Sequence, residues 1–345
     1  MQLLVITHNP DRASFRQRVG VHLDRLRSKG IDAAVAALPD SLRGRHAVWT
    51  AARKTDGILL HRKMLNAWDG FCLRRCARPV IYDFDDALMY SDHRPERNSY
   101  IRWRRFRRSV ALSHMVLAGN DYLAEHARRY RANVRILPTG LDVGAYRVSV
   151  PRLNDGLVRL VWIGSRSTLK YLHEIRPALE EVGRLLPHVV LRIVCDEFFD
   201  LTAMKVERRN WSKASEVADL LTSDIGLAPL PDDRFTRGKC GFKILQYQAA
   251  GLPVVASPIG VNAQYVREGA TGFLARDPAQ WVAKLRTLIE NLGLRATLGQ
   301  AGQSDVQRFD VNVIGERFCG LIAECLAPEH EGGNAFSVRE HGAAN

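Results

Sequence analysis

Short apolar runs alternate with longer amphipathic segments through most of the chain. In the first half, the strand-like runs occupy residues 3–7, 33–38, 57–60, 79–84, 114–119 and 134–138. The amphipathic segment at residues 15–29 is followed by Gly30, the residue type that most often ends a helix in the left-handed conformation. This alternation predicts an α/β fold with a parallel sheet.

The same alternation starts again after residue 156, with strand-like runs at residues 157–164, 189–195, 224–230 and 252–257. A chain of 345 residues also exceeds the size at which one hydrophobic core stops growing. We therefore expect two doubly wound, Rossmann-like domains, residues 1–150 and 151–326, joined by a linker at residues 142–156. Residues 327–345 are rich in Gly, Glu, His and Asn, and we expect this tail to be disordered.

The composition is that of a globular protein, but its charges are unbalanced. Hydrophobic residues make up 46% and charged residues 25% of the chain, which argues against a disordered or fibrous protein. The formal net charge of +13 favours anionic partners, namely nucleic acid, nucleotide phosphates or acidic lipid headgroups. The sign of the charge does not choose among these partners.

The cysteines and the N-terminus bear on location. The 6 cysteines show no paired spacing, so we expect free thiols and neither a zinc site nor a disulfide framework. The apolar run after Met1 has no basic region before it and no cleavage site, which favours a strand over a signal peptide. No run approaches the ~18 apolar residues of a membrane-spanning helix. We expect a cytoplasmic protein, with any membrane contact peripheral and at the inner face.

A glycine-rich turn, Gly238-Lys239-Cys240-Gly241, precedes a predicted helix at residues 242–250. Backbone amides at the start of a helix are unpaired and, together with the helix dipole, attract anions such as phosphate. Lys239 and Lys243 would add full charges, although a solvated lysine pair beside a tight turn fits the same spacing. The turn is not a Walker loop, because its glycine spacing differs and Cys240 replaces the hydroxyl residue that holds Mg²⁺.

Several longer stretches resemble one protein family. They are "GKCGFKILQYQAAGLPVVASPIGVN", "SDIGLAPLPDDRF", "REGATGFLA", "ASFRQR", "VIYDFDDALMY", "HMVLAGNDYLAEHA" and "VRILPTGLD", and together they resemble the retaining glycosyltransferases of family four, the glycosyl transferases group 1. The resemblance implies the GT-B fold, in which two Rossmann-like domains face a cleft. It further implies a nucleotide diphosphate sugar on the C-terminal domain, a glycan acceptor on the N-terminal one, and transfer with retention. No metal is obligatory in that family, and we expect no cofactor.

The resemblance also assigns residues on the donor side. Gln246 takes the position of the second Glu of the family's E-x7-E motif, which holds the ribose hydroxyls of the nucleotide. Gly238 takes the position of the first Glu, so the carboxylate that normally touches the donor sugar is absent. The backbone of Cys240, Gly241 and Phe242 would approach the sugar and the phosphate.

The loop "WIGSRSTLKYL" is expected to hold the other side of the diphosphate. The family carries a Gly-Arg pair and, one turn later, a Lys at this point. Gly164 and Lys170 match this pattern, whereas Ser165 stands at the Arg position and Arg166 lies one residue on. Cations near the leaving phosphate stabilise the transition state, so Lys170 and Arg166 are predicted to be catalytic. Two surface basic residues on a helix are the alternative.

The acidic residues Asp83, Asp85 and Asp86 lie at the carboxyl end of a predicted strand, where ligands gather in doubly wound folds. By the resemblance, Asp85 lies near a cleft His of other members and is a catalytic candidate, whereas Asp83 and Asp86 are acceptor-side candidates. Strand alternation puts Asp83 and Asp85 on one face. The metal-binding Asp-x-Asp of GT-A enzymes does not fit a chain with a second Rossmann-like half, and helix capping or pairing with arginines stays open. Arg16 and Arg18 are further acceptor-side candidates, with surface arginines as the alternative.

The segment "YIRWRRFRRSVAL" at residues 100–112 combines aromatic and cationic residues, as a helix on an anionic membrane or a nucleic-acid patch would. A helix docked by Trp103 and Phe106 with solvated arginines is the alternative. Overall, the sequence predicts a retaining, hexosyltransferase-like enzyme that acts on a hydroxyl of a polysaccharide or lipid-linked glycan. A degenerate, non-catalytic GT-B protein and a basic nucleic-acid-binding protein are the alternatives; no specific nucleic acid is expected, because no binding motif accompanies the charge.

Overall fold

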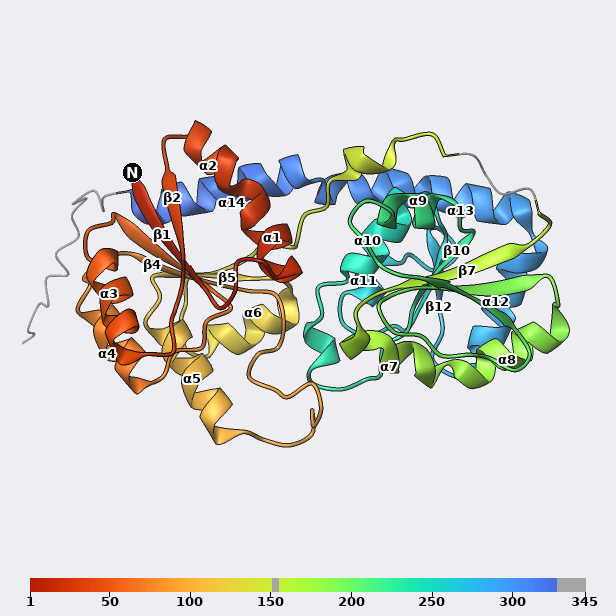
Figure 1. The fold of residues 1–345 in the computed structure, drawn as a ribbon, viewed down its shortest axis with the longest axis horizontal. Coiled ribbons are helices and arrows are strands. Elements are labelled where there is room, and N and C mark those ends of the chain that lie inside the picture. The colour runs from red at the N-terminus through yellow and green to blue at the C-terminus, as the bar shows by residue number, and fades with distance from the viewer. Residues whose placement is uncertain (151–154, 328–345) are drawn as a thin grey trace, which may run out of the picture.

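The computed structural model describes residues 1–150 and 155–327. Two lobes lie side by side, and each is built on a 6-stranded sheet (Figure 1). All strand pairs within the two sheets are parallel, which confirms the predicted fold class. Residues 151–154 of the predicted linker and residues 328–345 of the predicted tail lie outside the described residues.

The N-terminal lobe holds the sheet β2-β1-β3-β4-β5-β6. Its strands are β1 (Gln2–Thr7), β2 (Asp32–Ala37), β3 (Gly57–His61), β4 (Val80–Phe84), β5 (Met115–Ala118) and β6 (Val134–Ile136), and its helices are α1 (Ala13–Arg18), α2 (Leu23–Ser28), α3 (Leu42–Ala52), α4 (Ala67–Arg74), α5 (Tyr100–Ala111) and α6 (Asp121–Arg128). All of the strands predicted in this half are present. The single helix predicted at residues 15–29 is wrong, because a short 3₁₀ turn, η1 (Gly20–His22), separates α1 from α2. Glycine is a poor helix former, and Gly20 begins this turn.

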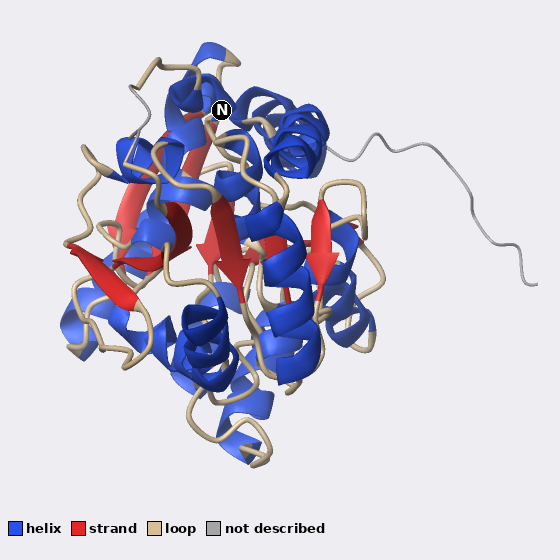
Figure 2. Cartoon of the chain, turned by 90° about the vertical axis from the view of Figure 1, so that its right-hand side faces the viewer, coloured by secondary structure: helices blue, strands red, loops and turns tan. Residues whose placement is uncertain are grey.

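The C-terminal lobe holds the sheet β12-β11-β10-β7-β8-β9, with helices on both faces (Figure 2). Its strands are β7 (Val158–Ile163), β8 (Val189–Val194), β9 (Lys205–Arg209), β10 (Ile225–Ala228), β11 (Val254–Ala256) and β12 (Gly272–Leu274), and its helices are α7 (Arg166–Glu174), α8 (Arg176–Leu185), α9 (Glu216–Leu221), α10 (Phe242–Ala249), α11 (Asn262–Tyr265), α12 (Pro278–Glu290) and α13 (Leu292–Asp305). Further 3₁₀ turns are η2 (Val143–Tyr146), η3 (Thr236–Gly238) and η4 (Val306–Phe309). The predicted helix after the glycine-rich turn is confirmed as α10.

The last helix, α14 (Val311–Leu326), returns to the N-terminal lobe, where it lies along the upper edge in Figure 1. Its apolar residues Phe318 and Ile322 are fully buried in one cluster with Leu3 and Val5 of β1. The boundaries expected from the sequence assigned this helix to the C-terminal domain, so the core of the N-terminal lobe includes a segment that the strand pattern did not reveal. In the described part of the chain, every helix is too short or too polar to cross a bilayer.

Candidate active site

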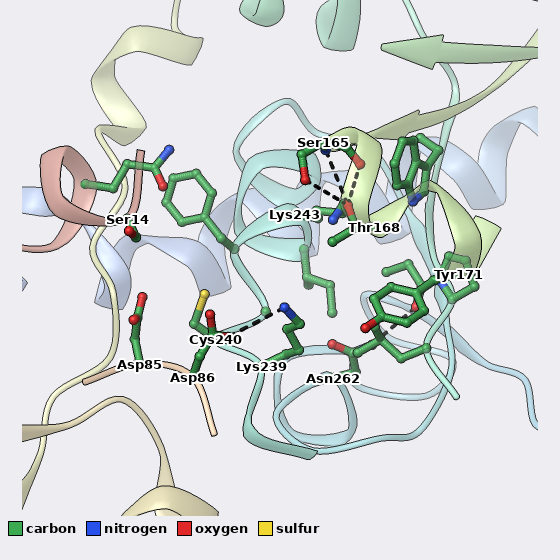
Figure 3. A pocket seen from close by; sticks show the side chains of 18 of the residues that line it. Ser14, Asp85, Asp86, Ser165, Thr168, Tyr171, Lys239, Cys240, Lys243 and Asn262 are labelled. Atoms are coloured by element: carbon green, nitrogen blue, oxygen red, sulfur yellow. Dashed lines mark hydrogen bonds and ion pairs between the residues drawn. The ribbon is translucent and has the colours of Figure 1, made fainter. Parts of the chain in front are cut away.

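A cavity of about 290 Å³ opens where β4, β7 and β10 end, so both sheets direct their carboxyl edges toward it. Ligands gather at this edge in doubly wound folds. Its lining residues come from both lobes and are Ser14, Gln17, Arg62, Asp85, Asp86, Trp162, Ser165, Thr168, Tyr171, Ala228, Pro229, Leu230, Lys239, Cys240, Gly241, Phe242, Lys243, Ile244 and Asn262 (Figure 3). The structure therefore brings together the glycine-rich turn, the start of α7 and two of the predicted aspartates.

The glycine-rich turn leads into α10 through Gly241, the N-cap residue, which has a left-handed backbone with φ of 66°. A Cβ atom there would lie 2.7 Å from Val261 Cγ2 and 2.9 Å from the Tyr265 ring, so only glycine fits. No side chain caps the helix, and its first residues, Phe242 and Lys243, line the cavity. The Phe242 amide contacts the Cys240 sulfur, and the start of α10 directs the positive end of the helix dipole to the cavity.

Two lysines add charge beside the start of α10. Lys243 is half-buried, and its ammonium lies 5.1 Å from the centre of the Trp162 ring. Burial, with a smaller contribution from Lys239, lowers the pKa of Lys243 to about 8. The ammonium of Lys239 lies 4.5 Å from the centre of the Phe235 ring and 3.6 Å from Asp86 Oδ1 of the other lobe. An anion in the cavity would stabilise the charged form of Lys243.

The start of α7 forms the opposite part of the C-terminal lining. Ser165 is its N-cap, and the Ser165 amide donates to Thr168 Oγ1 at 3.3 Å in a capping box. Gly164 does not line the cavity, but a Cβ there would lie 2.4 Å from the Trp162 ring, so it leaves the space that this ring needs. The loop therefore places one polar cap and one indole ring on the cavity.

The predicted catalytic cations lie beside the cavity, not in it. Lys170 Nζ is 2.5 Å from Asp92 Oδ1 and 3.0 Å from the Asp92 carbonyl oxygen, across the gap between the lobes. Tyr171, which lines the cavity, donates to the same carboxylate at 3.2 Å. Arg166 is the first residue of α7, and its 77% exposed side chain pairs with Glu197 at 2.6 Å. The structure does not bring Arg166 to the cavity, because its position at the helix start directs it to solvent.

The predicted aspartates divide into two groups. Asp85 and Asp86 line the cavity, and Arg62 bridges them: Nη1 donates to Asp85 Oδ1 at 2.9 Å and Nη2 to Asp86 Oδ2 at 2.7 Å. Asp83 is fully buried and does not line it; it accepts from Arg18 and from His61, both at 2.9 Å. Burial alone would raise the pKa of Asp83, but Arg18 and His61 outweigh it and hold that pKa below its usual value.

Three of the other predicted residues also lie outside the cavity lining. Arg18 is buried in the pair with Asp83, so pairing with an arginine, one of the alternatives, describes Asp83. Arg16 is exposed and donates to the Asp11 carbonyl. Gln246 is buried in α10, one turn below the cavity. Of the acceptor-side candidates, only Asp86 reaches the cavity.

The N-terminal lobe also holds the glycine-rich turn in place. Asn120, the N-cap of α6, donates through Nδ2 to the carbonyls of Gly238 at 3.2 Å and Lys239 at 3.3 Å. The Tyr122 hydroxyl donates to the Arg234 carbonyl at 3.0 Å. The two lobes are therefore in contact along one side of the cavity.

The sequence did not single out several lining residues. Trp162 and Tyr171 stand in the quoted loop, and Asn262 ends the longest quoted stretch, where its side chain donates to the Ala228 carbonyl at 3.2 Å. Their position within or at the end of these motif stretches could therefore have identified them as candidates. No sequence pattern pointed to Arg62. Its backbone has a φ of 54°, a conformation that is rare outside glycine and that no local pattern predicts.

Comparisons with known proteins agree with this arrangement. Residues 148–291, which include α7 and the glycine-rich turn, match the model of the family described as glycosyl transferases group 1. A D-inositol 3-phosphate glycosyltransferase of Corynebacterium efficiens is 31% identical over 119 residues, which are 34% of this chain and 27% of that protein. The chain thus spans less than a third of the length of these curated relatives.

Two solved structures cover almost the whole chain. Anabaena Alr3699/HepE in complex with UDP aligns with a TM-score of 0.71 at 19% identity, over 94% of this chain and 100% of that one. The same protein was also solved with UDP-glucose. Sucrose-phosphate synthase of Thermosynechococcus elongatus aligns with a TM-score of 0.73 at 14% identity, over 94% and 99% of the two chains. These likenesses show that the chain has the GT-B fold, with two Rossmann-like domains.

Proposed function

We propose that this protein is a retaining glycosyltransferase that moves a sugar from a nucleotide diphosphate sugar to a hydroxyl of a polysaccharide or lipid-linked glycan. One observation carries the proposal: a single cavity between the lobes joins the Lys239 and Lys243 amide turn to the start of α7. The match of residues 148–291 to a glycosyltransferase family, and the nucleotide complexes of a protein of the same fold, support it. Retention rests on the resemblance of the sequence.

In this proposal the diphosphate lies against the start of α10. The Lys243 amide and the two ammonium groups face the oxygens that gain charge when the glycosidic bond breaks. Such preorganised donors act on the transition state more strongly than on the ground state. Removing one of them typically costs about 10²- to 10³-fold in rate.

Lys170 takes part in this proposal through its neighbour Asp92. In the structure its ammonium is paired with that carboxylate at 2.5 Å. A diphosphate carries more charge than one carboxylate, so it would compete for the same ammonium when it enters the cavity. Lys170 is thus proposed to bind the diphosphate only after it leaves Asp92.

The exposed side of α4 and α5 suits a peripheral contact with an anionic membrane that carries a lipid-linked acceptor. Trp68 and Phe71 on α4 are 45% and 50% exposed, and Tyr100 and Ile101 on α5 are 73% and 64% exposed. Arg75 lies over the Phe71 ring at 4.6 Å and Arg104 over the Tyr100 ring at 5.3 Å, and Arg105 is exposed on the same helix as Arg104. Each arginine near an anionic bilayer contributes about 1 kcal/mol. Phe106 and Trp103 pack α5 against the core of the N-terminal lobe, as the alternative expected. Tyr100 and Ile101 of the same helix are exposed.

Calorimetry with a panel of nucleotide sugars and nucleoside diphosphates tests the proposal. One nucleotide sugar should bind, and Lys243→Met should weaken its binding at least tenfold, because a charge-assisted contact is lost. Lys213→Met removes an equally positive but exposed lysine and should leave binding unchanged. Binding without hydrolysis or transfer would favour the degenerate GT-B alternative. Selective binding of one oligonucleotide sequence, without nucleotide sugar, would favour the nucleic-acid alternative.

The configuration of the product separates retention from inversion. Proton NMR of the first-formed glycoside should show the same anomeric configuration as the donor. The opposite configuration would refute the retaining mechanism and leave the transferase activity standing.

A further inference from the structure

Arg62, Asp85 and Asp86 form a charged cluster on the N-terminal side of the cavity. Arg62 holds one oxygen of each carboxylate, at 2.9 and 2.7 Å. The cluster contains one positive and two negative charges, so it is anionic overall. Figure 3 shows Asp85 and Asp86 next to each other, with Asp86 joined to Lys239 of the opposite lobe. The N-terminal lobe therefore contributes the carboxylates of the cavity, and the C-terminal lobe contributes its two ammonium groups, with Lys239 and Asp86 in contact where the two sets meet.

One carboxylate oxygen of Asp85 has no hydrogen-bond donor within the described part of the chain. Its side chain is only 6% exposed, yet it lines the cavity. Oδ1 accepts from Arg62, and Oδ2 accepts no hydrogen bond from the described residues 1–150 and 155–327. Asp85 Oδ2 is not one of the sealed polar atoms of the described residues, and Asp85 lines the cavity, so a ligand there can donate a hydrogen bond to this oxygen.

The backbone of Arg62 shows that this arrangement is held against a local preference. Its φ of 54° is unfavourable for a residue with a side chain, and such strain persists only when the surroundings enforce it. The ion pairs to Asp85 and Asp86 supply that constraint, and the two carboxylates balance the charge of the buried guanidinium. The guanidinium fork fixes both carboxylates in a way that a lysine could not.

Gly238 stands where the family resemblance expects a glutamate, and the space around it is too small for a side chain. A Cβ at Gly238 would lie 2.7 Å from Ala87 Cβ and 3.0 Å from Leu123 Cδ2. No side chain fits there while the lobes are in contact. Ala87 directly follows Asp86, so the segment that fills this space is also the one that brings the carboxylates to the cavity.

We propose that Asp85 and Asp86 bind hydroxyl groups of the sugar of the donor, and that Arg62 is the positioning residue that holds them. The inference rests on the proposed function. A carboxylate beside a diphosphate would repel it, whereas sugar hydroxyls donate hydrogen bonds to carboxylates. A nucleotide diphosphate sugar thus matches the cavity, with its anionic part toward Lys239 and Lys243 and its hydroxyl-bearing part toward the aspartates.

The test compares each nucleotide sugar with its own nucleoside diphosphate. Dissociation constants are measured by calorimetry for UDP, GDP, UDP-glucose, UDP-N-acetylglucosamine and GDP-mannose. The sugar preference is defined as the dissociation constant of the diphosphate divided by that of its sugar nucleotide. The wild-type protein should prefer one sugar nucleotide. Asp85→Asn should reduce that preference at least about tenfold, because a hydrogen bond to a charged group is lost, and should leave the affinity for the diphosphate equal or higher.

Two further variants and a control complete the design. Asp86→Asn and Arg62→Lys should reduce the sugar preference in the same direction, with Arg62→Lys acting only through the position of the carboxylates. Asp24→Asn removes a fully exposed negative charge of the same lobe and should change neither constant. Melting temperatures show which variants are folded. If Asp85→Asn is unfolded, the sugar preference of Asp86→Asn tests the inference in its place.

The outcomes separate the two proposals. If no sugar nucleotide binds to the wild-type protein more tightly than its own diphosphate, the inference is overturned and the nucleotide site still stands. An unchanged sugar preference in both folded aspartate variants overturns it as well. Failure of the wild-type protein to bind any of these nucleotides refutes the proposed function, and the inference with it.

Discussion

At the scale of single residues, Lys243 is a cavity-lining cation whose charge depends on its surroundings. Its pKa of about 8 in the free protein results from burial, and a bound diphosphate would raise it. Below pH 8 the lysine is charged before and after binding, so affinity should be independent of this group. Above pH 8 binding must take up a proton, so affinity should fall by up to tenfold per pH unit.

Calorimetry at pH 7.0 and 9.0 in buffers of different ionisation enthalpy measures this proton uptake. Lys243→Met should abolish both the uptake and the pH dependence, whereas Lys213→Met should keep them. An affinity that does not change over this range in the wild-type protein would show that Lys243 stays charged without ligand.

Residue positions in the site were predictable to the extent that they lie on an element with a recognisable pattern. Lys239, Cys240 and Lys243 were identified because a turn before a helix fixes where its side chains go. Lys170 and Arg166 were expected in a loop around the diphosphate, but both lie in α7, where the helix start directs Arg166 to solvent and an aspartate of the other lobe holds Lys170. Such partners depend on tertiary contacts, which no local pattern records.

At the scale of elements, α10 depends on the left-handed glycine at its start. Gly241→Ala should destabilise the protein by about 1–2 kcal/mol from the backbone conformation alone, with an added clash against Val261 and Tyr265. Chemical denaturation measures this change. Gly320→Ala is the matched control: Gly320 lies inside α14 with open space around it, so the same substitution should stabilise by about 0.5–1 kcal/mol. Equal effects at both positions would contradict the strain at Gly241.

The strands were predictable where they are buried on both faces. β3 and β7 are buried at every position, and their continuous apolar runs were found. β9 and β12 were missed, because β9 is a polar edge strand and β12 has only 3 residues. The break between α1 and α2 was missed because both halves share one amphipathic pattern.

At the scale of the whole molecule, the structure has its lobes in contact, with Asp92 of one paired with Lys170 of the other. Lys170 is 41% and Asp92 27% exposed, and pairs this exposed contribute about 0.2–1 kcal/mol. Asp92→Asn should therefore strengthen nucleoside diphosphate binding by no more than about fivefold, since Lys170 is then free. Titration calorimetry checks this, with Asp24→Asn as the control for lost negative charge. Weaker binding in Asp92→Asn would show that Asp92 supports the site.

The joining of the lobes by α14 could not be predicted from the strand pattern. Its apolar face looks the same in the sequence whichever lobe it packs against, and only the structure shows Phe318 beside β1. The parallel arrangement of the strands, in contrast, follows from the alternation of elements.

The central claim is that one diphosphate lies between the start of α7 and the glycine-rich turn. Hydrogen exchange measured by mass spectrometry, with and without a saturating nucleoside diphosphate, tests it most directly, because it reports both segments in one experiment. The account predicts that residues 165–172 and 239–246 become protected together, and that Lys243→Met loses this protection in both. Protection of only one of the two segments, or of neither, would contradict it.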